Sequence, residues 1–256
     1  MSLSLRQSEI LALARDSGHV QVDDLARHFD VAVQTIRRDL AEMAEMGLLD
    51  RVHGGAVPRQ GVTNIAYEAR RRLNEAGKTA IAAACAAAIP DNSSLILNLG
   101  TTTEAVARAL LHHKNLTVVT NNMNVATILL QNPSCEIMVA GGALRRSDGG
   151  LIGDLTTEFF AQFKVDIAVI GASAIDADGD LLDYDLAEVR VSRAILAQAR
   201  AAYVVADHLK LARAAPARIA SLSKVDRLFT DAPLPPALAS RLAAWGTRVE
   251  IAAPPA

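Results

Sequence analysis

The chain has 256 residues, 51% of them hydrophobic and 21% charged, with a formal net charge of −2 at pH 7. It can bury a substantial core, as one large domain or as a small and a medium one, and it carries no polybasic tail. No stretch approaches the roughly 18 apolar residues of a membrane span. The N-terminus lacks the basic start and apolar core of a signal peptide, so we expect a cytoplasmic protein.

The two cysteines, Cys85 and Cys135, lie in apolar stretches without a Cys-x-x-Cys or Cys/His neighbour. We expect both to be reduced and buried. Their spacing gives no zinc motif, and the sequence supports neither a metal site nor a redox cofactor.

The first sixty residues predict helix, short strand, helix, turn, helix and hairpin, which is the order of a winged helix-turn-helix. Asp23 or Asp24 is expected to cap the second helix, and Gly47 to end the third in a left-handed conformation. The ranges are 5–17 and 24–29 for the first two helices, 19–22 for the strand, about 31–46 for the third helix and 48–55 for the hairpin.

The third helix carries an apolar stripe of Ile36, Leu40 and Met43 at helical spacing. Side chains long enough to reach base edges in a major groove occupy its other face. The hairpin adds cations at the height of the phosphates. The predicted DNA-binding residues are therefore Gln34, Thr35, Arg37, Arg38, Arg51 and His53. A purely protein-binding head is the alternative, although these polar side chains suit a groove better than an apolar partner.

Charge argues against this prediction, because residues 1–59 hold seven arginines and nine acidic residues. A DNA-binding domain is usually basic. The positive charge must then be local, and a homodimer or homotetramer that presents two such patches to paired half-sites of the DNA would strengthen binding.

Three segments are predicted: a winged helix-turn-helix at 1–57, a linker and connecting helix at 58–74, and an α/β domain at 75–256. The connecting helix contains Arg70, Arg71 and Arg72, which suit either a DNA-backbone or inter-domain contact or a solvated face. Short apolar strands alternate with helices in the third segment, which predicts a mostly parallel sheet covered on both faces. The strands are expected at 95–99, 116–120, 136–140, 166–171, 203–206, 227–230 and 248–251, and the helices at 75–89, 102–112, 124–130, 154–163, 187–201 and 236–245.

Ligands of such sheets bind at the carboxyl ends of the strands. Small, hydroxyl or basic residues follow five strands here, namely Gly100-Thr101-Thr102-Thr103, Asn121-Asn122, Gly141-Gly142 with Arg145 to Gly150, Gly171 to Ser173, and Asp207 to Lys210. Each of these is as easily a turn or a helix cap. Their coincidence predicts a small molecule with a phosphate and hydroxyl groups, because glycine turns and helix N-termini favour anions.

The segment QTIRRDL followed by HGGA resembles the head of the DeoR-type bacterial repressors. LNLGTTTEAVARALL, VTNNMNVA, AGGALRRSDGGLIG, DYDLAEVRVSRAI and TDAP follow in the order of that family's sensor domains, and the likeness runs from about residue 5 to 251. The resemblance implies a sensor with the fold of sugar-phosphate isomerases and deaminases. It also implies a sugar or polyol phosphate as effector, with glycerol-3-phosphate expected first.

By this resemblance, Gly100 to Thr103 and Arg145 hold the phosphate. The other residues expected at the pocket are Asn121, Asn122, Gly141, Gly142, Asp148, Gly149, Asp183, Glu188 and Lys210. The chain departs from the family pattern in two places. Ala32-Val33 replaces a Ser-Pro pair before the third helix, and Leu209 and Ala212 replace a serine and a glycine around Lys210.

Together these features predict a repressor of carbohydrate or glycerol metabolism genes that leaves double-stranded operator DNA when a small phosphate binds. One alternative is a repressor that responds to another sugar phosphate. The other is an isomerase-like enzyme that uses Asp183, Glu188 and Lys210 to move protons. Against the enzyme, residues 1–57 would be superfluous, and the loop 176–180 has no histidine beside its acids.

Overall fold

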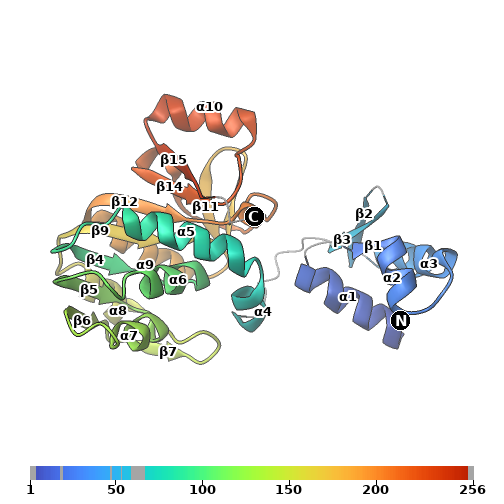
Figure 1. The fold of residues 1–256 in the computed structure, drawn as a ribbon, viewed down its shortest axis with the longest axis horizontal. Helices are drawn as coiled ribbons and strands as arrows, with labels where there is room; N and C mark the ends of the chain where they lie inside the picture. The colour runs from blue at the N-terminus through green and yellow to red at the C-terminus, as the bar shows by residue number, and fades with distance from the viewer. Residues whose placement is uncertain (1–3, 18–19, 47, 53, 59–66, 253–256) are drawn as a thin grey trace. The chain divides into compact units, whose positions relative to one another are not determined.

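The computed structural model describes residues 4–17, 20–46, 48–52, 54–58 and 67–252 (Figure 1). Internal contacts divide the chain into two units, Met1–Ile65 and Ala66–Ala256. The predicted cap Gly47, the wing residue His53 and most of the predicted linker lie outside the described residues. The predicted connecting segment 58–74 is split by this division, since its helical part belongs to the second unit.

The first unit has the predicted winged helix-turn-helix order. Its elements are α1 (Leu5–Ser17), β1 (Val20–Gln21), α2 (Val22–His28), α3 (Val33–Glu45), β2 (Leu49–Val52) and β3 (Gly55–Pro58). The strands form an antiparallel sheet in the order β1-β3-β2, and the predicted hairpin is confirmed by β2 and β3. The predicted stripe is also confirmed, because Ile36, Leu40 and Met43 are all at most 1% exposed in one core with α1 and α2.

The start of α2 corrects a prediction. The helix begins at Val22, its N-cap is Gln21, and no side chain caps it. Asp23 and Asp24 instead occupy the first turn, where their negative charge still interacts favourably with the helix dipole.

The second unit is built on a seven-stranded parallel sheet, as predicted, with the strand order β15-β14-β12-β9-β4-β5-β6. Its strands are β4 (Ser94–Leu97), β5 (Leu116–Thr120), β6 (Cys135–Val139), β9 (Val165–Ile170), β12 (Ala199–Val205), β14 (Arg227–Thr230) and β15 (Arg248–Ile251). Its helices are α4 (Tyr67–Arg72), α5 (Glu75–Ala87), α6 (Thr101–Ala109), α7 (Met123–Leu129), α8 (Asp154–Phe160), α9 (Leu186–Ala197) and α10 (Pro236–Trp245).

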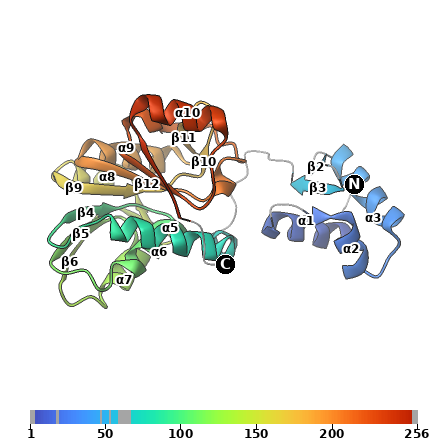
Figure 2. The same ribbon diagram turned by 45° about the horizontal axis from the view of Figure 1, so that its top comes forward.

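Two apolar cores lie on opposite faces of this sheet. In β4, Leu95 and Leu97 join a core with α5, α6 and α7, whereas Ile96 joins a core with α8, α9 and α10. Figures 1 and 2 both show α5 and α6 side by side over one face. Strands buried on both faces read as continuous apolar runs, which is why the sequence showed them clearly.

Short antiparallel strands were missed by the sequence analysis. They are the hairpin of β7 (Ala143–Arg145) and β8 (Gly150–Ile152), and a small sheet of β10 (Ala174–Ile175), β11 (Asp180–Asp183) and β13 (Ala217–Ser221). The helix expected at 187–201 ends at Ala197, because Ala199 and Ala201 pair with β9 as the start of β12. Alanine favours helix by propensity, and tertiary pairing overrides that preference here.

Cys85 is buried, as predicted, but Cys135 is only half-buried because it lies on the edge strand β6. No described helix has the length and apolar character needed to span a bilayer.

Candidate DNA-binding surface and effector site

The exposed face of α3 presents the residues expected to meet DNA. Gln34, Arg37 and Arg38 are exposed and Thr35 is half-buried. Ala32 is the N-cap of the helix and offers no side-chain acceptor to its free amides. The replacement of serine by alanine therefore leaves the start of α3 without a cap, as expected from the sequence.

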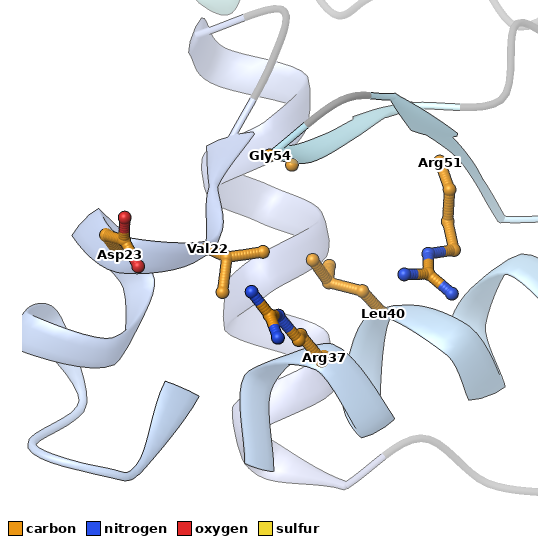
Figure 3. A pocket seen from close by; sticks show the side chains of 7 residues that line it. Val22, Asp23, Arg37, Leu40, Arg51 and Gly54 are labelled. Carbon is orange, nitrogen blue, oxygen red and sulfur yellow. The ribbon is translucent and has the colours of Figure 1, made fainter. Parts of the chain in front are cut away.

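A cleft lies between α3 and the wing (Figure 3). Arg37 borders it from α3 and Arg51 borders it from β2, with Asp23 on its far side. Within the described residues neither guanidinium makes an ion pair, so both charges remain available to an anion. Two arginines from two elements at one cleft suit the successive phosphates of a nucleic-acid backbone.

Three acidic residues of this unit pair away from that cleft. Arg6 Nε lies 2.6 Å from Asp39 Oδ2 between α1 and α3, and the Asp39 side chain is 9% exposed. Asp24 pairs with Arg27, and Glu9 lies 3.3 Å from His28. These pairs leave Asp23 as the acidic residue among those that border the cleft. Arg38 lies 3.1 Å from Glu42, but a pair that exposed is weak.

The second unit has a cleft where β4, β9 and β12 end. It is lined by Arg70, Leu99, Gly100, Thr101, Thr102, Thr103, Gly171, Ala172, Ser173, Asp183, Glu188, Val205 and Lys210. Seven of the residues expected at the pocket line it, namely Gly100, Thr101, Thr102, Thr103, Asp183, Glu188 and Lys210. Gly100 has φ 141°, a conformation that favours glycine, and it turns the chain from β4 into α6. The N-terminus of α6 thereby meets the cleft, where its free amides suit an anion.

Two cations, Arg70 and Lys210, line this cleft, and two more interact with Lys210. Burial, and then the positive charge of Arg213, lower the pKa of Lys210 to about 8 against the opposing effect of Asp207. Burial also lowers the pKa of Lys78 and of Arg213. The charge of Asp207, which is 2% exposed, acts on Lys210, Lys78 and Arg213, and the charge of Arg70 acts on the same three cations. Such an excess of buried positive charge is stabilised when an anion binds.

Arg70 is a cleft residue that the sequence analysis did not find. Its Nη2 lies 3.6 Å from Asp148 Oδ2, and its Nε is buried without a hydrogen-bond partner among the described residues. Three consecutive arginines stand at 70–72, and nothing in their pattern indicates which one turns inward. Arg71 and Arg72 of the same helix are exposed.

Carboxylates gather around Arg145, and one of them, Glu188, lines the cleft. The guanidinium lies 2.6 Å from Asp148, 2.9 Å from Asp185 and 2.7 Å from Glu188. Burial, and then the charge of Asp183, raise the pKa of Glu188 above its usual range although Arg145 opposes the shift. Arg145 was expected to hold phosphate. It does not line the cleft, and its donors are instead engaged by three acids.

Five other expected residues lie around the β7–β8 hairpin rather than on the cleft surface. Asn121 Nδ2 donates to the Leu151 carbonyl at 3.1 Å, and Asn122 Oδ1 caps α7 by accepting from Asn124 N at 3.0 Å. A Cβ on Gly142 would stand 2.2 Å from Thr156 Oγ1, so only glycine fits there. Gly141 is exposed, and Gly149 has φ 71°. These positions fix the hairpin that carries Arg145 and Asp148.

Two family models match the chain in sequence. The DeoR-like helix-turn-helix domain matches residues 6–60, and the DeoR C terminal sensor domain matches residues 73–232. The match at 6–60 covers the elements α1 to β3. The match at 73–232 begins just after α4. It includes every residue that lines the cleft except Arg70, which lies on α4.

Curated relatives match along nearly their whole length. The glycerol-3-phosphate regulon repressor of Escherichia coli (strain K12) is 44% identical over 92% of this chain and 93% of its own. The protein of that name from Haemophilus influenzae is 47% identical over 90% of each chain. The HTH-type transcriptional repressor CsqR of Escherichia coli is 42% identical over 97% of this chain and 95% of its own.

Proposed function

The chain belongs to the DeoR family, and on that premise we propose that it represses transcription by binding operator DNA through α3 and the wing. A small phosphorylated polyol, glycerol-3-phosphate in the first place, binds the cleft of the second unit and releases the DNA. The relatives that match over nine-tenths of both chains are named repressors, so the isomerase-like alternative is set aside and the chain is not an enzyme.

The mixed lining of the cleft, which holds both cations and carboxylates, is the observation that carries the effector proposal. Lys210, Arg70 and the N-terminus of α6 can hold a phosphate. Asp183 and Glu188 can accept hydrogen bonds from hydroxyl groups. A molecule with a phosphate on one terminal carbon and hydroxyls on the next two, as glycerol-3-phosphate has, matches this set of donors and acceptors.

The DNA-binding half of the proposal rests on the cleft between α3 and the wing. Arg37 and Arg51 would contact phosphates there, while Gln34 and Arg38 on α3 would read base edges. A homodimer or homotetramer would place two such heads on half-sites one or more helical turns apart. Two heads also offset the small number of free cations on each.

Release requires that the effector bind the DNA-free form more tightly than the DNA-bound form. A hundredfold loss of operator affinity corresponds to about 2.7 kcal/mol of differential binding. One phosphate that gains or loses a charged partner between the two forms supplies an effect of that size.

Another sugar phosphate is the second candidate effector. It is favoured by Leu209 and Ala212, which stand beside Lys210 where the family pattern has a serine and a glycine. The Leu209 amide donates to Asp207 Oδ1 at 3.1 Å, so the local turn forms without the serine, but position 209 offers no hydroxyl to a ligand.

Operator binding by the purified full chain tests the proposal. The chain's own upstream region is titrated at fixed salt, alone and with glycerol-3-phosphate or each of a panel of sugar phosphates. Loss of binding with glycerol-3-phosphate alone supports both halves of the proposal. Loss with a different phosphate replaces the effector, and an absence of specific binding under every condition refutes the repressor.

A further inference from the structure

We propose that α4 passes effector binding on toward the DNA-binding unit, with the Tyr67 hydroxyl as the latch that holds α4 on the second unit. This inference rests on the proposed function. In chain order α4 is the first described element after β3, so its position sets where the connection to the head begins. Three sets of contacts tie it to the cleft.

The first set surrounds a buried carboxylate. The Tyr67 hydroxyl lies 2.9 Å from both Oε1 and Oε2 of Glu104, whose side chain is 2% exposed. Glu104 lies in the first turn of α6, directly after the threonines that line the cleft. Among the described residues, only Tyr67 and Asn124 donate to this carboxylate. A buried carboxylate depends strongly on its hydrogen-bond donors, so the Tyr67 hydroxyl couples α4 to the start of α6.

Asn124 extends the contact to the β7–β8 hairpin. Its Nδ2 lies 2.9 Å from the Tyr67 hydroxyl, 3.1 Å from Glu104 Oε1 and 3.0 Å from the Asp148 carbonyl. Asp148 in turn pairs with Arg145 and lies 3.6 Å from Arg70. One polar network therefore joins Tyr67 to the start of α6 and to the ion pairs around Arg145.

The second set involves Arg70, three residues after Tyr67 on α4. Its guanidinium lines the cleft, its Nε lacks a partner among the described residues, and its contact with Asp148 is longer than a hydrogen bond. A phosphate in the cleft would offer Arg70 a better partner than Asp148 does. Because residues three apart share a helix face, a shift of Arg70 acts directly on the Tyr67 contact.

The third set is a cap. Lys78 Nζ donates to the carbonyls of Arg70 and Leu73 at the end of α4. With six residues, α4 is too short to be stable alone and depends on docking. The Lys78 ammonium also interacts with the charges of Asp207, Arg213 and Arg70. A bound phosphate would attract this ammonium and so compete with the α4 carbonyls that accept its hydrogen bonds. Effector binding and α4 docking are thus coupled at both ends of the helix.

Tyr67→Phe in the full chain tests the latch, because it removes only the hydroxyl and leaves the cleft lining intact. The matched control is Tyr203→Phe, whose hydroxyl makes a single 3.5 Å contact with the Ala88 carbonyl away from the cleft. Each protein is titrated with glycerol-3-phosphate, or with whichever panel phosphate releases the wild-type chain. Operator Kd is measured with and without that ligand at saturation.

We expect Tyr67→Phe to bind the phosphate within about threefold of wild type. We expect the effector-induced change in operator Kd to fall by about tenfold, within the range of ordinary coupling energies. Tyr203→Phe should behave as wild type. Full coupling in Tyr67→Phe overturns the latch while leaving the repressor intact. If no phosphate changes the operator Kd of the wild-type chain, both proposals are overturned.

Hydrogen exchange of the wild-type chain gives a second test that needs no variant. Saturating phosphate should change the exchange rates of the α4 amides at least severalfold, while amides of the head without DNA serve as the internal reference. Unchanged exchange across residues 67–72 would contradict a helix that moves or re-docks with the effector.

Discussion

The lowered pKa of Lys210 predicts that effector binding depends on pH. Burial and Arg213 lower its pKa to about 8 in the free protein, and a bound phosphate would raise that pKa again. Binding therefore takes up a proton above about pH 8, and effector affinity should fall there by up to about tenfold per pH unit. Titration calorimetry of the full chain between about pH 7 and 9.5 measures it.

Lys210→Arg is the control for this pH dependence, because a guanidinium keeps its charge throughout that range. The fall in affinity above about pH 8 should disappear in the variant. The same fall in both proteins would assign the titration to another group. Below about pH 6 the phosphate ester itself loses charge, so a decline on the acid side carries no information about Lys210.

Ala32 leaves the N-terminus of α3 uncapped, and a serine there should stabilise the helix. Its φ of −61° and ψ of 142° are those of an N-cap, so a serine hydroxyl can reach the free amides without backbone change. We expect Ala32→Ser to add about 0.5–1 kcal/mol to local stability, measured as slower hydrogen exchange of the α3 amides. Ala41→Ser within the same helix should give no gain. Equal protection in both variants would rule out a capping effect.

At the scale of elements, the predictable parts are those whose physics is local. The stripe of Ile36, Leu40 and Met43 repeats at helical spacing, and β4 is a continuous apolar run, so both were evident from sequence. Ala199–Ala201 was assigned to a helix because alanine favours helix, whereas pairing with β9 decided the outcome. Strands as short as β10 have no periodicity to detect.

The candidate site divides in the same way. Gly100 to Thr103 and Lys210 follow strands of a parallel sheet, so topology alone predicts that they converge. Arg70 comes from a helix outside the strand-end rule, and only the three-dimensional packing of α4 on α6 brings it to the cleft. Arg145 was expected to contact a phosphate by resemblance. Its donors instead contact Asp185, the N-cap of α9, and Glu188 within that helix, which both lie far from it in sequence.

Arg145 joins the β7–β8 hairpin to the start of α9, so its removal should loosen both. Arg145→Met would leave Glu188 buried without its paired cation and Asp148 with only the 3.6 Å contact to Arg70, and breaking a buried pair costs about 3–5 kcal/mol. Denaturant unfolding followed by the fluorescence of Trp245, the single tryptophan, reports the second unit alone. The loss should shrink toward acidic pH, since protonation removes the uncompensated charge.

Arg218→Met is the matched control for that measurement. Arg218 Nε lies 2.7 Å from Asp180, but its side chain is 59% exposed, and such surface pairs contribute at most about 1 kcal/mol. A similar loss of stability in both variants would mean that burial of the Arg145 cluster adds nothing.

For the whole molecule, the division into two units predicts that DNA binding and effector binding can be damaged separately. Arg37 borders the cleft of the head, whereas the effector cleft is built wholly from the second unit. Arg37→Ala should weaken operator binding by about tenfold or more, since contacts to bases or phosphates contribute about 1–3 kcal/mol each. Its affinity for the phosphate effector in the absence of DNA should equal that of wild type.

Salt dependence distinguishes what Arg37 contacts. If Arg37 meets a phosphate, the slope of log Kd against log salt should fall by about one unit for each head in Arg37→Ala, with similar losses on all sequences. If it reads a base edge, the slope stays and discrimination among operators falls instead. Arg27→Ala is the control, because Arg27 pairs with Asp24 on α2 and does not border the cleft. Equal loss of operator and effector affinity in Arg37→Ala would contradict two separable units, since no described residue of the head lines the effector cleft.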